Sequence, residues 1–406
     1  MNKDMDKKMK LSERAQNIQE SPIRKLKPLA DQIEAKGIKI YHLNIGQPDI
    51  ETPKEILKVY KKYHEKVLAY GPSQGLDLYR QNLVNYYKNN NIDVKDDEII
   101  VTTGGSEAII FALMATCNPG DEVIIPEPFY TNYNGFAKMA GAKIVPLTTY
   151  TRDGYQLPSD EEIKKLINEK TKAILFCSPN NPTGAVYPSE DLERVAKIVQ
   201  ENNLYIISDE VYREFIYNGE EKISLLNIKG VEDNVIMVDS ISKRYSACGA
   251  RVGCLVSRNK EIIAAVLKFA QARLCPPTID QLAANAAIDI KDDYFDKLLK
   301  EYDKRRNIVY DELCKIDGIN CKKPNGAFYI MAKLPIDDAD NFVKWLLTDF
   351  SIDNETLMLA PGRDFYTHSD YGRDKVRIAY VLNEKDLKRA MYIFKKGLEE
   401  YIKIKK

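Results

Sequence analysis

Several short stretches of this 406-residue chain place side chains that could do chemistry directly after β-rich segments. One of them, DSISKRYSACGARVG, carries Lys243 and Arg251 with small residues between them. A lysine in a partly desolvated site beside another cation has a lowered pKa, so its amine can act as a nucleophile. The small neighbours leave room for a ligand phosphate. Taken alone, Lys243 is most often a surface residue, but the stretches described next favour a lysine that forms a Schiff base.

The stretch TTGGSEA follows a strand-like segment and is expected to open a helix. Gly104 and Gly105 let the backbone approach an anion, and the free N–H groups at the start of a helix point toward it. We interpret the stretch as a candidate phosphate site. The alternative is an ordinary Gly-Gly turn with Ser106 as the helix N-cap, and this stretch by itself favours the alternative.

Two further stretches supply amide and carboxylate groups. In CSPNNPTG, two prolines hold the loop extended, so that Asn180 and Asn181 present amides beyond the strand end; a simple polar turn is equally compatible. In SDEVYREF, Asp209 ends a strand, where a buried carboxylate needs a partner. A protonated pyridine nitrogen is such a partner, and the carboxylate would keep the ring electron-accepting. A helix N-cap or a salt bridge is the alternative.

These stretches lie where strand-like segments alternate with helical patterns, from about residue 98 to 260. The segments are EIIVTT, EVIIP, AKIVPL, KAILFC, LYIISD, VIMVDS and RVGCLVS. The alternation predicts an α/β fold with a mostly parallel seven-stranded sheet flanked by helices. In such sheets ligands bind beyond the carboxyl ends of the strands. The later chain, with GAFYIMAKL, KVRIAYVL and a closing helix from about Glu384, predicts a smaller α+β layer.

The composition of the chain indicates which kinds of ligand or partner the protein is expected to bind. Because 60 basic residues balance 60 acidic ones, we expect a small-molecule substrate rather than nucleic acid or a membrane. The apolar runs are too short to span a bilayer and the start MNKDMDKKMK lacks a secretory apolar core, which predicts a cytoplasmic protein. Seven cysteines without a C-x-x-C pair and three isolated histidines predict no disulfide framework and no metal site, and most thiols are expected to be buried.

The motifs SPNNPTG, SDEVY and SISKRYSACGARVG resemble, in order and spacing, those of the class I/II aminotransferases, enzymes of fold type I that use pyridoxal 5'-phosphate. The similarity extends from LSERAQNIQESPIRKL to KVRIAYV and so covers nearly the whole chain. It implies three parts: an N-terminal arm that belongs partly to the small domain (1–55), a large cofactor-binding domain (56–300) and a small C-terminal α+β domain (301–406).

The resemblance also implies a role for each matching residue. Lys243 would hold the cofactor as a Schiff base and then move the proton on the substrate. Asp209 would pair with the pyridine nitrogen, while Asn181 and Tyr212 would hydrogen-bond the phenolic oxygen of the ring. The residues that would bind the phosphate are Gly105, Ser106, Ser240, Ser242, Arg251 and, from a neighbouring subunit, Tyr70.

Three more residues complete the implied site. Tyr130 would stack on the pyridine ring, Gly46 would offer a backbone contact near the substrate, and Arg377 would bind the substrate α-carboxylate in bidentate fashion. The reach of Tyr70 into a neighbouring site implies a homodimer with active sites at the subunit interface.

The substrate is less well indicated, because QARLCPPTIDQ and APGRDFYTHSDYG depart from the commoner patterns of the family. Arg273 or Arg363 could meet a second substrate carboxylate, or could form surface ion pairs. We expect a ping-pong transaminase of amino acid metabolism acting on L-aspartate and 2-oxoglutarate. The alternatives are an alanine, aromatic or broad-specificity aminotransferase, a cysteine-sulfur β-lyase on the same fold and, ranked last for want of a DNA-binding module, a non-catalytic sensor.

Overall fold

The computed structural model describes residues 9–21, 24–290 and 293–405. Its central sheet has seven strands in the order β2-β8-β7-β6-β5-β3-β4. Their bounds are β2 (Ile99–Thr102), β3 (Glu122–Glu127), β4 (Lys143–Thr148), β5 (Thr171–Cys177), β6 (Tyr205–Asp209), β7 (Val235–Ser240) and β8 (Gly253–Val256). Strand β8 runs in the direction opposite to the other six strands of this sheet, and these six share one direction. The predicted mostly parallel seven-stranded sheet is confirmed.

Alternate residues of these strands pack against different helices, because successive side chains of a strand point to opposite faces. Ile207 and Val238 belong to one hydrophobic cluster, whereas Ile206 and Met237 belong to another. The first cluster includes side chains from α5 (Gly104–Thr116), α6 (Asn132–Ala140) and α10 (Lys260–Arg273). The second includes side chains from α4 (Asp77–Asn89), α7 (Asp160–Lys164), α8 (Ser189–Glu201) and α11 (Thr278–Asn285). We call these the α5 face and the α8 face of the sheet.

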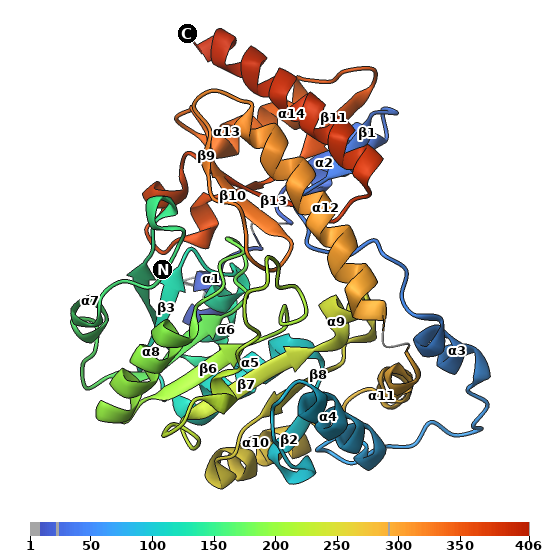
Figure 1. Ribbon diagram of the computed structural model, residues 1–406, viewed down its shortest axis with the longest axis vertical. Coiled ribbons are helices and arrows are strands. Elements are labelled where there is room, and N and C mark those ends of the chain that lie inside the picture. Colours follow the sequence, from blue (N-terminus) through green and yellow to red (C-terminus); the bar gives the residue numbers. More distant parts are fainter. Residues whose placement is uncertain (1–8, 22–23, 291–292, 406) are drawn as a thin grey trace, which may run out of the picture.

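The C-terminal part is built on an antiparallel sheet in the order β12-β13-β10-β9. Its strands are β9 (Asn320–Cys321), β10 (Tyr329–Lys333), β12 (Ala360–Pro361) and β13 (Lys375–Ala379), and its helices are α12 (Tyr294–Cys314), α13 (Ala339–Thr348) and α14 (Glu384–Lys405). The predicted strands and closing helix are therefore present. Figure 1 shows α12 extending from beside the central sheet toward α14.

The N-terminal segment joins this C-terminal part. Strand β1 (Lys39–His42) pairs in parallel with β11 (Glu355–Met358), and α2 (Lys27–Glu34) lies beside them (Figure 1). Ala30 and Ile33 of α2 share a hydrophobic cluster with Leu347 of α13. The remaining helices are α1 (Glu13–Asn17), α3 (Lys54–Lys62), α9 (Ile241–Arg244) and the short 3₁₀ turns 96–98, 151–153, 225–227, 248–250, 286–289, 363–365 and 369–372.

Two expectations about the chain as a whole can be compared with the structure. None of the helices in the described ranges is both long and apolar enough to cross a bilayer. All seven cysteines are free thiols, but only Cys117, Cys177 and Cys254 are buried. The expectation that most are buried is therefore wrong, because the other four lie on loops or on helix and strand ends near the surface.

Candidate active site

A cavity of about 540 Å³ lies between the two parts of the molecule, where the ends of β5, β6 and β7 meet the start of α5 and the strands β10 and β13. Its position beyond the carboxyl ends of the parallel strands is the one predicted for a ligand. Of the thirteen predicted site residues, the cavity brings together twelve: Gly46, Gly105, Ser106, Tyr130, Asn181, Asp209, Tyr212, Ser240, Ser242, Lys243, Arg251 and Arg377.

Strand alternation decides which residues face the cavity. Asp209 follows Ile207 by two residues and Ser240 follows Val238 by two, so both lie on the α5 face of the sheet. Their chain neighbours Glu210 and Asp239 do not line the cavity. The same motifs therefore supply polar groups to both faces of the sheet, and only the groups on the α5 face reach the cavity.

The start of α5 has the geometry expected of an anion site. Its N-cap is Thr103, which makes no side-chain cap bond to the first turn, so the prediction of Ser106 as a possible N-cap is wrong. Ser106 instead lines the cavity. Gly104 has a φ of +73°, and a Cβ there would lie 2.4 Å from an Arg251 guanidinium nitrogen. Glycine is thus required where arginine packs over the helix start, and the two together offer backbone N–H groups and a cation.

Asp209 is buried in the cavity floor without a cationic partner among the described residues. The Tyr133 hydroxyl donates to its Oδ2 at 2.7 Å, and the Val211 N–H donates to its Oδ1 at 3.4 Å. Burial raises the pKa of Asp209 to about 6, although the bond from Tyr133 acts in the opposite direction. A carboxylate in this position is stabilised by any cation that enters the cavity above it.

Lys243 projects from α9 into the same cavity. Its Nζ donates to the Gly46 carbonyl oxygen at 2.8 Å and lies 3.7 Å from the Cys248 Sγ. Removal from bulk water lowers the pKa of Lys243, and the charges of Arg377 and Arg251 lower it further. Its amine is therefore easier to deprotonate than that of a surface lysine, as nucleophilic attack requires.

Arg377, on β13, is buried with no carboxylate partner among the described residues. Its Nη1 donates to the Asn181 Oδ1 at 2.8 Å and its Nη2 donates to the Asn44 carbonyl oxygen, while its Nε has no hydrogen-bond acceptor. The guanidinium lies 4.5 Å from the Tyr329 ring centroid. Burial lowers the pKa of Arg377. An anion that entered here would pair with an otherwise uncompensated buried cation.

The residues that would contact the cofactor ring form a connected group. The Asn181 Nδ2 lies 3.5 Å from the Tyr212 hydroxyl, which lies 2.8 Å from the Tyr329 hydroxyl. Tyr329 also explains why Gly46 is a glycine, since a Cβ there would lie 1.7 Å from the Tyr329 hydroxyl oxygen. Asn181 and Tyr212 thus present polar groups to the cavity from the segments that follow β5 and β6.

Four residues considered from the sequence lie elsewhere. Tyr70 is 81% exposed and does not line the cavity of its own chain. Asn180 faces its own loop, where its Oδ1 accepts bonds from Thr183. Arg273 pairs with Glu107, and Arg363 pairs with Asp338 and Asp340, outside the cavity of the same chain.

The cavity also contains residues that sequence reasoning missed. They are Ser21, Arg24, Ile45, Gln47, Ile109, Asn132, Cys177, Val211, Cys248, Gly249 and Tyr329. Cys177 lies on β5 with the same parity as Leu175 and could have been found from strand alternation, whereas Val211 and Cys248 lie beyond strand ends within the quoted motifs. Ser21, Arg24 and Tyr329 carried no local signal, because contacts far apart in sequence bring them to the cavity.

The donors around the cavity fit pyridoxal phosphate. A buried carboxylate without a cation suits a protonated ring nitrogen, and a helix start beside an arginine suits a phosphate. A lysine with a lowered pKa between these two features suits covalent attachment of an aldehyde. The three requirements of the cofactor are thus met by residues of one cavity.

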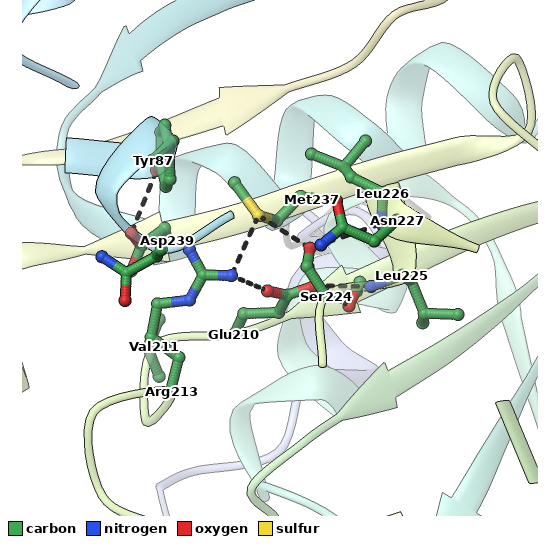
Figure 2. A network of polar contacts seen from close by, with 12 residues as sticks. Tyr87, Glu210, Val211, Arg213, Ser224, Leu225, Leu226, Asn227, Met237 and Asp239 are labelled. Carbon is green, nitrogen blue, oxygen red and sulfur yellow. Dashed lines mark hydrogen bonds and ion pairs between the residues drawn. The ribbon is translucent and has the colours of Figure 1, made fainter. Parts of the chain in front are cut away.

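A buried polar network lies on the α8 face, behind the cavity floor. It comprises Tyr87, Glu210, Arg213, Ser224, Asp239 and Arg244, most of which are seen in Figure 2. Glu210 pairs with Arg213 and accepts a bond of 2.9 Å from the Ser224 hydroxyl. Asp239 pairs with Arg244 and accepts a bond of 3.0 Å from the Tyr87 hydroxyl. Each carboxylate of the network therefore has a cation, in contrast to Asp209.

The chain is similar to known proteins over nearly its whole length. The sequence profile of the family described as aminotransferase class I and II matches residues 38–393. The aspartate aminotransferase of Pyrococcus abyssi is 34% identical over 401 residues, covering 97% of this chain and 99% of the relative. The aromatic-amino-acid aminotransferase 2 of Thermococcus litoralis is 33% identical over 398 residues, with coverage of 97% and 99%.

The solved structures agree. The alanine aminotransferase of Pyrococcus furiosus superimposes with a TM-score of 0.87 at 34% identity, covering 96% of this chain and 100% of that one. The predicted fold type I architecture is therefore confirmed over nearly the whole chain. The names of the relatives cover aspartate, aromatic amino acids and alanine, so the comparisons agree on the reaction and differ on the amino acid.

Proposed function

Because the chain belongs to the class I and II aminotransferases, we propose that this enzyme transfers the amino group of L-aspartate to 2-oxoglutarate, with pyridoxal 5'-phosphate as its cofactor. The observation that carries the proposal is the set of uncompensated charges in one cavity, namely Asp209, Lys243 and Arg377. The names of several relatives, including those of Bacillus subtilis and Pyrococcus abyssi, support aspartate as the donor.

Pyridoxal phosphate, when bound, supplies an aldehyde that attaches amines and a ring that accepts the electrons released at the substrate α-carbon. Lys243 Nζ provides the attaching amine and, once the substrate has displaced it, serves as the base and acid that moves the α-proton. Its hydrogen bond to the Gly46 carbonyl oxygen holds Nζ over the cavity. Attachment and proton abstraction both need the neutral amine, which the lowered pKa of Lys243 favours, and the proton that Lys243 takes up makes it the acid of the next step.

The other side chains orient and hold charge. Asp209 stabilises a positive charge at the ring nitrogen, and Tyr133 holds the Asp209 carboxylate in place by its 2.7 Å bond. Arg377 would bind the substrate α-carboxylate, and its bonds to Asn181 and Asn44 fix the guanidinium plane. Tyr130, which lines the cavity beside Asp209, would cover the ring and exclude water.

The remaining predicted phosphate ligands extend this arrangement. Ser240 and Ser242 have their hydroxyl oxygens 2.8 Å apart at the start of α9, close to the start of α5. With Gly105, Ser106 and Arg251 they would surround the phosphate. This assignment is supported by their common position in the cavity.

We propose further that two copies of the chain form a dimer in which Tyr70 reaches the phosphate of the partner. Tyr70 is 81% exposed, and Val67 and Leu68 beside it are 74% and 60% exposed. Exposed apolar side chains of this kind suit an interface.

We also propose that the chain divides into an N-terminal arm (1–55), a large domain (56–300) and a small domain (301–406). Helix α12 crosses the boundary at residue 300 and so connects the two domains.

The proposed function is tested by the visible absorbance of the purified protein loaded with pyridoxal phosphate. We expect L-aspartate to bleach the yellow band and 2-oxoglutarate to restore it, whereas L-alanine and L-phenylalanine leave it largely unchanged. If another amino acid bleaches the band, the choice of aspartate is wrong. If cysteine releases pyruvate and ammonia without a keto acid, the enzyme is a lyase and the proposal is overturned.

A further inference from the structure

The cavity holds more positive charge than the proposed reaction uses. Four cationic side chains line it, against a single carboxylate among the described residues, Asp209; the cations are Arg24, Lys243, Arg251 and Arg377. The proposed function assigns Lys243 to the aldehyde, Arg251 to the phosphate and Arg377 to the substrate α-carboxylate. Arg24 is therefore the one described cation of the cavity for which neither the cofactor nor the α-carboxylate accounts.

Arg24 is available for a ligand. Its side chain makes no ion pair and no hydrogen bond within the described part of the chain, and it is exposed at the rim of the cavity. Many exposed arginines are in this state, so availability by itself assigns no role. What distinguishes Arg24 is that described residues near it in sequence, Gln19 and Lys25, contact the C-terminal domain.

The segment around Arg24 is tied to the C-terminal domain on both sides. The Gln19 Nε2 donates to Asp364 at 2.7 Å, and the Lys25 Nζ pairs with Asp340 at 2.9 Å and with Asp364 at 3.1 Å. The backbone N–H groups of Arg24 and Lys25 both donate to the Ser21 carbonyl oxygen at 2.9 Å. These contacts turn the chain so that Arg24 faces the cavity while Lys25 faces the domain.

The positive charge of Arg24 acts on the Tyr130 hydroxyl inside the cavity. Burial raises the pKa of the Tyr130 hydroxyl, and the positive charges of Arg377 and Arg24 act in the opposite direction. The Asn132 Nδ2 donates to the same hydroxyl at 2.8 Å and also lines the cavity. Arg24 therefore lies close enough to Tyr130, which lines the cavity together with Asn132 and Arg377, for its charge to act inside the cavity.

The two arginines considered from the sequence are engaged elsewhere in the same subunit. Arg273 lies 3.3 Å from Glu107 and donates to the Val101 carbonyl oxygen at 3.2 Å. Arg363 lies 2.6 Å from Asp338 and 3.2 Å from Asp340. Within one subunit, both arginines are paired with carboxylates and neither lines the cavity.

We propose that Arg24 binds the side-chain carboxylate of a dicarboxylic substrate and so determines the preference for aspartate, glutamate and their 2-oxo acids. The inference rests on the proposed function, because it takes the other three cations as occupied by the cofactor and the α-carboxylate. A guanidinium is suited to the task, since its planar N–H groups can grip a carboxylate with two parallel bonds. The rim position explains how the site would hold the end of the substrate that points away from the reacting carbon.

The test compares Arg24→Gln with Arg14→Gln in the enzyme loaded with pyridoxal phosphate. Arg14 lies on α1, is exposed and does not line the cavity. We expect Arg24→Gln to lower kcat/KM for L-aspartate and 2-oxoglutarate about tenfold and to leave the value for L-alanine within about threefold, because an exposed ion pair contributes modestly. Arg24→Lys should recover part of the loss, and Arg14→Gln should change neither substrate.

A binding measurement separates this role from an effect on chemistry. Calorimetric titration with succinate and with propionate reports affinity without turnover, and only succinate offers a second carboxylate. We expect Arg24→Gln to weaken succinate binding about tenfold and propionate binding hardly at all. An equal loss for both acids, or none for either, overturns the inference. If instead the unaltered enzyme transaminates no amino acid, it is the proposed function that fails, before any Arg24 variant is compared.

Discussion

Two regions of the molecule, the cavity and the buried network behind its floor, share two motifs that supply charged residues to both. Asp209 is followed by Glu210, Ser240 is preceded by Asp239, and Lys243 is followed by Arg244. On the α8 face, Glu210 pairs with Arg213 and Asp239 pairs with Arg244. On the α5 face, Asp209 and Lys243 have no ion pair among the described residues.

The difference teaches how to tell a scaffold charge from a functional one. A buried charge is costly unless it is paired, so pairing is expected where the charge serves only the fold. Charges left uncompensated in a cavity are stabilised only when a ligand arrives. The cavity is therefore expected to tolerate neutralising substitutions structurally and to lose activity, whereas the network should lose stability.

The largest effects are expected from the neighbours Lys243 and Arg244. Lys243→Ala should lower kcat for transamination roughly 10⁴-fold or more, because no other lysine amine lines the cavity among the described residues. Its free energy of unfolding should stay within about 1 kcal/mol, as no ion pair is lost. Arg244→Ala should instead cost roughly 3–5 kcal/mol, because it leaves Asp239 buried without its cation.

Urea unfolding of both variants, with turnover per folded molecule, measures this contrast. Because Arg244→Ala could fail to fold, Arg244→Lys provides a milder change that keeps a cation near Asp239. An active Lys243→Ala enzyme would contradict the proposed mechanism. A stable Arg244→Ala protein would contradict the role given to the network.

The two buried aspartates, Asp209 in the cavity and Asp239 in the network, give the next contrast. Asp209→Asn should lower kcat roughly 10²–10³-fold by removing the charge beneath the cofactor ring, with no loss of stability in the cofactor-free protein. Asp239→Asn should leave kcat within about threefold and lower the free energy of unfolding by about 3 kcal/mol, since Arg244 loses its carboxylate. Steady-state kinetics and urea unfolding check both. Equal changes in kcat and in the free energy of unfolding for the two variants would contradict the distinction between the cavity and the network.

A pH dependence of similar size follows from Asp209 in the cofactor-free protein. Its folded pKa of about 6 lies above the ordinary 3.8, so between these pH values the folded protein binds more protons than the unfolded chain. The stability contribution of the protonated group is therefore present below pH 4 and lost as the pH rises through 6, by roughly 3 kcal/mol in total. Stability measured from pH 4 to 7, relative to Asp209→Asn, should show this fall. A flat difference would show that the carboxylate is not desolvated.

The smallest effects concern two tyrosines that donate to buried aspartates. Tyr133→Phe removes the 2.7 Å bond to Asp209, and Tyr87→Phe removes the 3.0 Å bond to Asp239. We expect Tyr87→Phe to cost about 1 kcal/mol of stability without changing kcat. Tyr133→Phe should mainly lower kcat, by about threefold to tenfold, and shift its acidic limb to higher pH. Equal effects on kcat would remove the distinction between the two aspartates.

The sequence by itself determined the order of the motifs along the chain and more than half of the residues that line the cavity. Asp209 and Ser240 end strands of a predominantly parallel sheet, Asn181 and Lys243 follow such strands, and parallel strands end at one edge of the sheet. Their convergence could therefore be predicted from local patterns alone. Odd and even positions of β6 and β7 also point to different faces, so the division between the two faces follows from position along the strand.

Only the tertiary structure decided which other side chains reach the cavity. Gln19 and Asp364 are 345 residues apart in sequence, and Lys25 and Asp340 are 315 apart, yet these pairs place Arg24 at the rim. The same folding engages Arg273 and Arg363 in ion pairs, the alternative that the sequence left open for both residues. Long-range pairings of this kind depend on how the two domains dock, and short motifs hold no information about that docking.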